Sequence, residues 1–292
     1  MNPLPEAEIG ALPIWRGPIK IKPLNGGITN RNYLVDDGAR RAVVRFGADI
    51  PVHHILRSNE LAASEAAHAA GLSPAVLHHA PGLLVLDYVD AAAFTPEDVR
   101  KPGMLERIVP LIRQCHRDMP KYFRGSAAIF WVFHVVRDYA GALKDGGSIH
   151  LPLIPPLLEK AAHLEQAAGP FEIVFGHNDL LAANLLDDGE RLWLIDWDYA
   201  GFNTPLFDLG GLASNNELSP EAEKAMLELY YERPLTDELL RRYEAMKCAS
   251  LLRETMWSMI SEIHSTIDFD YSAYTAENLA RFERAFDTFS RI

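Results

Sequence analysis

A strand-rich insert within a helical region constrains the fold of this chain more than any other feature. The runs Glu172–Phe175 and Leu192–Ile195 are apolar and strand-like, and Asn184–Leu186 lies between them. Most of the surrounding sequence predicts helices, at about 103–119, 130–144, 155–168, 220–230 and 236–264. The larger part of the chain is therefore expected to be helical with one β-rich segment built into it.

The first 90 residues show a different, turn-rich pattern. Short β-prone runs at Asn32–Val35 and Arg41–Phe46 flank Asp36-Asp37-Gly38, which is a hairpin signal. Leu56–Ala70 follows as a helix, with Ser58 as its expected N-cap. Two more strands are expected at Pro74–Leu77 and Leu83–Val89.

A change in composition near Asp90–Pro96 marks the boundary between these two patterns. The sequence predicts an α+β fold of two lobes, with a small antiparallel sheet in the first and mainly helices in the second. The expected domains are an N-lobe at residues 1–90 and a helical C-lobe at residues 91–292.

Polar residues with a particular spacing stand at the ends of the strands in the insert. His177, Asp179 and Asn184 read H-x-D-x-x-x-x-N, and Asp196 follows 12 residues after Asn184. Phosphoryl transfer needs a carboxylate at the acceptor hydroxyl, oxygen ligands for Mg²⁺ and a cation for the transferring charge. Asp179 suits the first role as catalytic base, Asn184 and Asp196 suit metal binding, and His177 is expected to support the loop by hydrogen bonding. A hairpin with polar ends is the alternative, but the combined pattern is far more specific.

A second segment resembles a catalytic motif only superficially. Residues 115–118 read Cys-His-Arg-Asp, but Phe123 stands where an asparagine would be needed and Pro120 lies close by. The stretch fits the end of a helix better, and we do not expect a site there.

The N-lobe offers candidate nucleotide contacts. Gly26, Gly27, Thr29 and Asn30 lie in a turn whose backbone N–H groups could approach phosphates, although two glycines alone also fit an ordinary hairpin. Asp87 and Tyr88 end a strand at the lobe boundary, where backbone groups could pair with an adenine edge.

Arg45 is a single cation inside the apolar strand Val43–Phe46. A buried arginine needs an anionic partner, and Glu60 is the best candidate, with Glu65 second. Such a pair touching nucleotide phosphates would parallel the Lys–Glu pair of protein kinases. The alternative is an exposed edge position for Arg45.

Composition excludes several classes of function. The chain has 292 residues and a net charge of −12, and no run of Lys or Arg forms a basic face, so a nucleic-acid binder is not expected. Its two cysteines, Cys115 and Cys248, are far apart and read as free thiols. Neither a secretory signal nor an apolar run of the roughly 20 residues that span a bilayer is seen, so we expect a cytoplasmic protein without membrane insertion.

Together these residues resemble the choline/ethanolamine kinase family, within the wider aminoglycoside-phosphotransferase-like group. The matching pieces include GGITN, AVVRF, GHNDLLAANLL, LIDWDYAG, FDLG and the segment Trp257–Tyr274. The resemblance implies a protein-kinase-like two-lobed fold, ATP as donor, Mg²⁺, and an amino-alcohol acceptor. By motif match Asp179 would be the base, Asn184 and Asp196 the metal ligands, and Arg45 the contact to the phosphates.

The resemblance also places Tyr199, Trp257, Phe269 and Tyr274 in the acceptor pocket. Aromatic faces and carboxylates can hold a quaternary ammonium, which donates no hydrogen bonds. The helix at 236–264 would carry Glu254 on the same face as Trp257, three residues away. From the residues alone, core packing beside a solvated acidic loop would be the simpler interpretation.

Two positions depart from the family pattern. Glu254 stands where the family usually has a second tryptophan, and Asn215 where it often has an acidic residue. An extra carboxylate at Glu254 would favour an acceptor with N–H groups, such as ethanolamine.

The sequence thus predicts an ATP- and Mg²⁺-dependent kinase of a small cationic alcohol, most simply choline or ethanolamine. A kinase of another small molecule, such as an aminoglycoside, a sugar or a thiamine-like alcohol, is the first alternative. An inactive kinase-fold binding module is the second, supported only by Arg45 in place of a lysine. The oligomeric state is not predicted.

Overall fold

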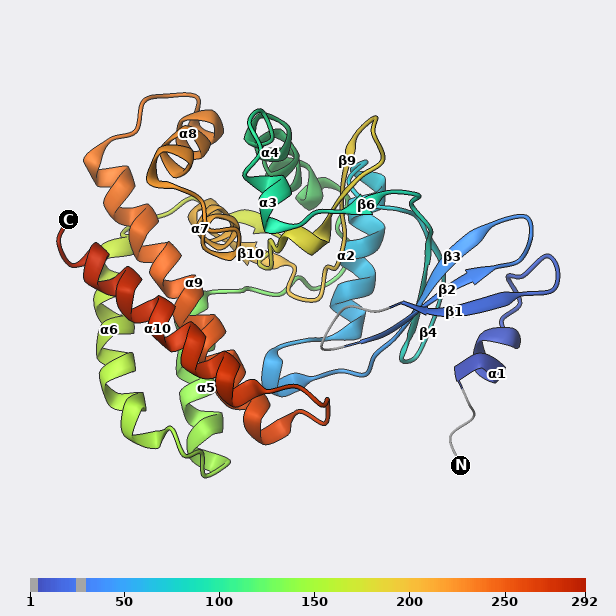
Figure 1. The fold of residues 1–292 in the computed structure, drawn as a ribbon, viewed down its shortest axis with the longest axis horizontal. Coiled ribbons are helices and arrows are strands. Elements are labelled where there is room, and N and C mark those ends of the chain that lie inside the picture. The colour runs from blue at the N-terminus through green and yellow to red at the C-terminus, as the bar shows by residue number, and fades with distance from the viewer. Residues whose placement is uncertain (1–4, 25–29) are drawn as a thin grey trace.

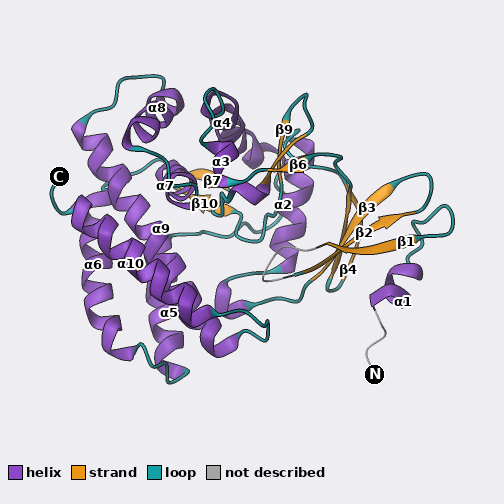
Figure 2. Cartoon of the chain, in the orientation of Figure 1, coloured by secondary structure: helices purple, strands orange, loops and turns teal. Residues whose placement is uncertain are grey.

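The computed structural model describes residues 5–24 and 30–292, and it separates into a sheet-rich part and a helical part (Figures 1 and 2). A five-stranded antiparallel sheet of order β1-β2-β3-β5-β4 forms the first part. Its strands are β1 Lys20–Leu24, β2 Arg31–Asp36, β3 Arg41–Phe46, β4 Val76–Ala80 and β5 Leu83–Asp87. The predicted hairpin at residues 36–38 is confirmed, since it joins β2 to β3.

The two faces of this sheet differ because side chains alternate along each strand. Ala42 and Val44 of β3 point into a small core, where Ile9 of helix α1 (Pro5–Gly10) packs against them. Arg45 lies between Val44 and Phe46 and therefore points to the opposite face, toward helix α2 (Arg57–Ala69). The strand alternation thus places the one cation of Val43–Phe46 on the face that meets the rest of the molecule.

Helix α2 links the two parts (Figure 1). Its residues Ala63, Ala66 and Ala67 belong to the large core of the helical part, although α2 lies within the first 90 residues. The domain boundary at residue 90 therefore stays a prediction. The expected N-cap Ser58 is wrong, because the helix begins one residue earlier and its N-cap is Leu56, without a side-chain hydrogen bond.

The helical part is built around α9, a helix of 28 residues. Helices α5, α6, α7 and α10 pack against α9, and α10 runs along it (Figure 1). The helices are α3 Pro96–Val99, α4 Leu105–Tyr122, α5 Val132–Asp145, α6 Ile154–Ala168, α7 Pro205–Asn215, α8 Pro220–Tyr231, α9 Asp237–His264 and α10 Tyr271–Phe289. Short 3₁₀ turns occur at η1 Pro51–His53, η2 Leu151–Leu153 and η3 Ala182–Asn184.

Five of these helices match the sequence expectation, but the short α3 and the longer α7 and α10 were missed. Pro205, Gly210 and Gly211 weaken the helical signal of α7, and tertiary packing overrides it because nine residues of that helix are buried. The start of α10 overlaps the segment ending at Tyr274 that the sequence assigns to the acceptor pocket.

The β-rich insert is present, with its strands shifted by one or two residues. Strand β7 (Val174–Gly176) pairs with β10 (Gly201–Asn203), and β8 (Leu185–Asp187) pairs with β6 (Ala92–Ala93) and β9 (Leu192–Leu194). Asn184 is the last residue of η3 rather than the first of a strand. In the described ranges, no helix is both long and apolar enough to cross a membrane.

Candidate active site

The loop after β7 is held in place by one buried carboxylate. Asp208, in the first turn of α7, accepts the backbone N–H groups of His177 at 2.8 Å and Asn178 at 2.7 Å. The same carboxylate also binds Nε2 of His116 at 2.8 Å. Gly176 allows this approach, because a Cβ there would lie 3.1 Å from Oδ2 of Asp208 and closer still to Asn178.

His177 supports the loop from within, as the sequence predicts. Its side chain is fully buried, and its Nε2 lies 2.9 Å from the carbonyl oxygen of Ile195. The backbone N–H of Asp179 donates to its Nδ1 at 3.3 Å, so the proton of the neutral ring is assigned to Nε2. Burial lowers the pKa of His177, which favours this neutral form.

Asn178 fixes the turn that presents Asp179. Its φ of 65° lies in the left-handed region, where asparagine is better tolerated than most residues. Its amide donates to the carbonyl of Tyr199 at 2.9 Å and accepts from Asn203 at 3.0 Å. The backbone strain is thus compensated by hydrogen bonds at the position before the candidate base.

Asp179 faces a small recess between the loop, α7 and α9. The recess is also lined by Asn215, Ser250, Arg253 and Glu254. Burial raises the pKa of Asp179 to about 7, Arg253 lowers it, and Glu254 and Asp196 raise it further. A carboxylate of this kind ionises near neutral pH, which is the range in which a general base is most effective.

The β8–β9 hairpin brings Asn184 and Asp196 to the same end of the insert. Leu185 pairs with Leu194, and the next residue, Ile195, donates its N–H to the carbonyl of Asn184 at 3.0 Å. The side-chain amide of Asn184 donates to the backbone carbonyl of Asp179 at 2.9 Å. This hydrogen bond connects the predicted metal ligand Asn184 directly to the predicted base Asp179.

The donor set at this end suits Mg²⁺. Asn184 and Asp196 supply hard oxygens, and Mg²⁺ is usually bound by one or two carboxylates together with substrate phosphates. In the described part of the chain no group of three or more His, Cys, Asp or Glu side chains could hold a metal by itself. A metal at this site would therefore depend on oxygens brought by a ligand.

Arg45 is buried among carboxylates, so the alternative of an exposed edge position is wrong. It lies 3.2 Å from Glu60, its expected partner, and also contacts Asp196 at 2.7 Å and Asp198 at 3.1 Å. Glu65, the second candidate, is exposed. The network joins the sheet to the end of the catalytic hairpin.

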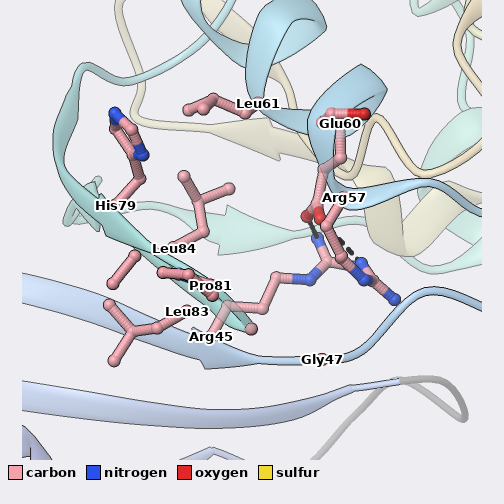
Figure 3. A pocket seen from close by; sticks show the side chains of 12 residues that line it. Arg45, Gly47, Arg57, Glu60, Leu61, His79, Pro81, Leu83 and Leu84 are labelled. Atoms are coloured by element: carbon pink, nitrogen blue, oxygen red, sulfur yellow. Dashed lines mark hydrogen bonds and ion pairs between the residues drawn. The ribbon is translucent and has the colours of Figure 1, made fainter.

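A second arginine completes this network. Nη1 of Arg57 bonds Glu60 at 2.7 Å and Asp198 at 2.8 Å. Figure 3 shows Arg45 reaching from β3 toward Arg57 and Glu60, beside a pocket that Leu61, His79, Pro81, Leu83 and Leu84 also line. Two guanidinium groups therefore balance most of the negative charge of three buried or half-buried carboxylates.

The structure bears on only some of the other predicted nucleotide contacts. Gly26, Gly27 and Thr29 lie outside the described residues, whereas Asn30 donates from Nδ2 to Asp198 at 3.1 Å. The N–H groups of Asp87 and Tyr88 already donate to Ala75 and Arg41. Their contact with adenine stays a prediction, and it would have to use other backbone atoms.

The predicted acceptor residues form one contiguous group. The indole N–H of Trp257 donates to the hydroxyl of Tyr199 at 2.9 Å, and the hydroxyl of Tyr274 donates to Glu254 at 2.8 Å. The ring of Phe269 meets Tyr274 edge-on at 5.7 Å between centroids. Tyr199 and Trp257 are buried, whereas Phe269 is 44% exposed.

Sequence reasoning missed several residues of the site: Arg57, Asn178, Asp198, Asp208 and Arg253. Asp208 stands alone in the apolar run Pro205–Ala213, and Arg253 follows the apolar pair Leu251–Leu252. A charged residue isolated in an apolar stretch signals a buried, partnered charge, and this signal could have identified Asp208. Arg253 stands next to Glu254, so the sequence carries no such signal for it. The rejected motif at residues 115–118 lies in the last turns of α4, as expected, where Asp118 pairs with Arg117 and Lys121.

Comparisons with known proteins identify relatives of this chain. Rat ethanolamine kinase 2 is 26% identical over 94% of this chain and 77% of its own length. A choline/ethanolamine kinase family protein from Mesorhizobium loti superposes with a TM-score of 0.81 at 28% identity, covering 98% of this chain and 95% of that one.

The choline kinase LicA from Streptococcus pneumoniae has the same fold, with a TM-score of 0.78 at 20% identity over 97% of each chain. The predicted two-lobed, kinase-like fold is therefore confirmed. Residues 20–246 match the model of the phosphotransferase enzyme family, and the chain belongs to that family.

Proposed function

We propose that this protein transfers the γ-phosphoryl group of ATP to the hydroxyl of a small amino alcohol, most simply ethanolamine or choline. One observation carries the proposal. Asp179 lies in a recess at one end of the catalytic loop, and the side chain of Asn184, a candidate metal ligand, bonds its backbone directly. The acceptor hydroxyl and the donor phosphates would therefore meet at Asp179.

Asp179 acts as the general base in this scheme. It accepts the proton of the acceptor hydroxyl while that oxygen attacks the phosphorus, and its pKa of about 7 suits this exchange. His177 positions the base, since its ring accepts the N–H of Asp179. The hydroxyl proton thus ends on the Asp179 carboxyl and leaves to solvent after product release.

The phosphate side of the site is formed by Asn184, Asp196 and Arg45. Mg²⁺ held by Asn184 and Asp196 would neutralise charge on the phosphate oxygens. Arg45 contacts Asp196 at 2.7 Å, so its guanidinium stands next to the same oxygens and can stabilise the transferring group. Gly26, Gly27, Thr29 and Asn30 are proposed to approach the phosphates from the N-lobe, and Asp87 and Tyr88 to meet the adenine.

The substrate class is supported by the relatives and by the acceptor group. The matched proteins carry the names ethanolamine kinase and choline kinase. Glu254 supplies a carboxylate next to the recess, and the rings of Phe269 and Tyr274 lie beside it, backed by the buried pair Tyr199 and Trp257. An inactive binding module is disfavoured, because Asp179, Asn184, Asp196 and Arg45, the residues proposed as base, metal ligands and phosphate contact, are all retained.

A coupled assay of ADP release tests the proposal. Purified protein with ATP and Mg²⁺ should turn over ethanolamine or choline at millimolar concentration and show far less turnover with an aminoglycoside, a sugar or thiamine. Asp179→Ala should abolish the ADP release. If neither amino alcohol is phosphorylated, the proposed acceptor class is wrong; if ADP release persists in Asp179→Ala, the proposed base is wrong.

A further inference from the structure

A buried arginine occupies the aromatic surface of the acceptor group. The guanidinium carbon of Arg253 lies 4.2 Å from the centre of the Tyr199 ring and 5.7 Å from that of Phe130. Arg253 is only 4% exposed. The face of Tyr199 that could receive a substrate cation is thus already covered by a cation of the protein.

The second predicted aromatic contact is covered as well. The ring of Trp257 stacks on His53, with 4.9 Å between centroids and 29° between planes. Tyr271 approaches the same indole at 6.1 Å, and Trp257 is 4% exposed. Trp257 therefore supports Tyr199 through its hydrogen bond but offers little open surface itself.

A quaternary ammonium has few other ways to bind. It donates no hydrogen bonds, so it depends on open aromatic faces and on nearby carboxylates. A fixed guanidinium on Tyr199 removes one such face. It also repels any incoming cation, and a primary ammonium can offset this repulsion with hydrogen bonds that a quaternary one cannot make. The site as folded is thus poorly suited to a trimethylated nitrogen.

The recess beside Asp179 has a different chemistry. Arg253 lines it too, but so do Asn215, Ser250 and Glu254, and each of these three carries an oxygen that can accept a hydrogen bond. Glu254 is bound by Arg253 at 2.9 Å and by Tyr274 at 2.8 Å, but a carboxylate has about four acceptor positions in all. The side chain of Glu254 is 22% exposed, so an acceptor position on it is within reach of a ligand.

We propose that Arg253 is a specificity-determining residue that closes the aromatic face of Tyr199 to quaternary ammonium groups and restricts the acceptor to amino alcohols with free N–H groups. A primary ammonium such as that of ethanolamine donates three hydrogen bonds and can use the partly exposed carboxylate of Glu254 at the edge of the recess. This inference rests on the proposed function, because it selects within that substrate class.

A methylation series tests the inference directly. Ethanolamine, N-methylethanolamine, N,N-dimethylethanolamine and choline share one hydroxyl and differ in the number of N–H groups. For the wild type we expect kcat/KM to fall along the series, at least tenfold between ethanolamine and choline. Arg253→Met keeps the apolar stem, removes the charge, and should raise the choline-to-ethanolamine ratio of kcat/KM by at least tenfold.

Two further variants test whether a change in acceptor preference comes from the charge of Arg253 or from a general effect of losing an arginine. Arg253→Lys retains a cation and should keep choline the poorer substrate. Arg137→Met removes an exposed arginine that pairs with Glu165 on α6, far from the recess in sequence, and should leave the ratio unchanged. Should Arg253→Met fail to fold, a wild type or an Arg253→Lys variant that uses choline as well as ethanolamine would still overturn the inference.

The outcomes are distinguishable. A wild type that uses choline as well as ethanolamine overturns the role of Arg253, while the proposed function stands. An unchanged ratio in a folded Arg253→Met variant does the same. A wild type that phosphorylates none of the four compounds overturns the proposed acceptor class and this inference with it.

Discussion

Nη2 of Arg45 lies 2.7 Å from Oδ1 of Asp196, so a cation from the sheet contacts the residue that follows the catalytic hairpin. Asp198 at 3.1 Å and Glu60 at 3.2 Å from the same guanidinium extend this contact to α2. Burial lowers the pKa of Arg45, but these three carboxylates raise it by a larger amount. The pKa therefore lies above its ordinary value, and the group stays charged. The contact therefore couples the stability of the fold to the geometry of the site.

Replacing Arg45 by methionine should destabilise the protein and impair its use of ATP. Removing one partner of a buried ion pair leaves the others uncompensated and typically costs about 3–5 kcal/mol. Urea denaturation measures this loss of unfolding free energy, and the KM for ATP should rise in parallel. Arg113→Met is the control, because its pair with Glu232 is exposed and worth about 0–1 kcal/mol. Equal effects of the two substitutions would contradict the proposed role of the network.

Replacing Asp179 by asparagine should abolish turnover while making the protein more stable at pH 8. Burial raises the pKa of Asp179 to about 7, above its value in an unfolded chain. The unfolded state therefore loses this proton at lower pH than the folded state, and stability falls as pH rises from about 4 through 7. Asparagine stays neutral, so the variant should have the higher Tm at pH 8 and no advantage near pH 4.

Thermal unfolding without Mg²⁺ and nucleotide measures this difference. Asp188→Asn is the matched control, since hydrogen bonds from the backbone N–H of Arg191 and from Trp193 hold the pKa of Asp188 down at about 2. That substitution should not raise Tm. A lower Tm for Asp179→Asn at pH 8 would show that the carboxylate is not under the strain inferred from its burial.

Asp208→Ala should disorganise the catalytic loop. The carboxylate is 2% exposed, and its loss leaves two buried backbone N–H groups, those of His177 and Asn178, without their acceptor. Each unsatisfied buried donor costs about 1–3 kcal/mol. We expect a large drop in kcat as well, because the position of Asp179 depends on this loop. Asp118→Ala, at a partly buried acid in the rejected motif that pairs only with Arg117 and Lys121, should leave kcat unchanged. A kcat preserved in Asp208→Ala would refute the anchoring role.

The sequence indicates candidate catalytic residues but not the residues that support them. Asn184 and Asp196 stand out because they flank the β8–β9 hairpin, and His177 and Asp179 because they lie in the short loop before it; their roles stay predictions. Arg45 and Glu60 could be paired because a buried cation requires an anion. In contrast, Asp208 and Arg253 act across elements far apart in the chain, and no local pattern states what they will meet.

The missed helices have a similar explanation. The sequence of α7 carries Pro205 and two adjacent glycines, which lower its intrinsic helical preference, and burial against α9 supplies the stability instead. The aromatic and acidic residues at the start of α10 fit a pocket wall equally well. The intrinsic helix propensity of these segments could not predict either helix, because packing against α9 stabilises both.

Stability should also depend on His53. Burial first, and then Arg253, lower the pKa of His53 to about 3, whereas a histidine in an unfolded chain titrates near 6.5. Below about pH 6.5 the unfolded state therefore binds a proton that the folded state does not. As the pH is lowered from 6.5 to 3, this group should reduce the free energy of unfolding by up to about 1.4 kcal/mol per pH unit.

Urea denaturation of wild type and His53→Gln between pH 7 and 5 tests this dependence. Glutamine does not titrate, so the difference in unfolding free energy between the two proteins should shrink as pH falls. His79→Gln changes an exposed histidine and should leave the slope as in the wild type. A parallel pH dependence of wild type and His53→Gln would rule out a neutral, buried His53.

Gly210 sets how closely α7 approaches α9. A Cβ at this position would lie 2.8 Å from the Cα and 2.9 Å from the backbone N of Lys247, and backbone atoms of a buried helix cannot move aside. Gly210→Ala should therefore push the two helices apart and cost about 1–3 kcal/mol of unfolding free energy, although alanine favours helix formation. The shift would also separate Asp208 on α7 from the acceptor residues on α9, so kcat should fall with stability.

The neighbouring glycine provides the control. A Cβ at Gly211 would meet only the side-chain oxygen of Ser250, at 3.5 Å, which is ordinary van der Waals contact. Gly211→Ala should therefore be neutral or stabilising, by up to about 1 kcal/mol from helix propensity. Opposite signs for two adjacent Gly→Ala substitutions in urea denaturation would show that contact with the α9 backbone, rather than helix propensity, fixes this interface. If both variants are equally stable, the spacing of α7 and α9 is adjustable and does not hold the acceptor recess in shape.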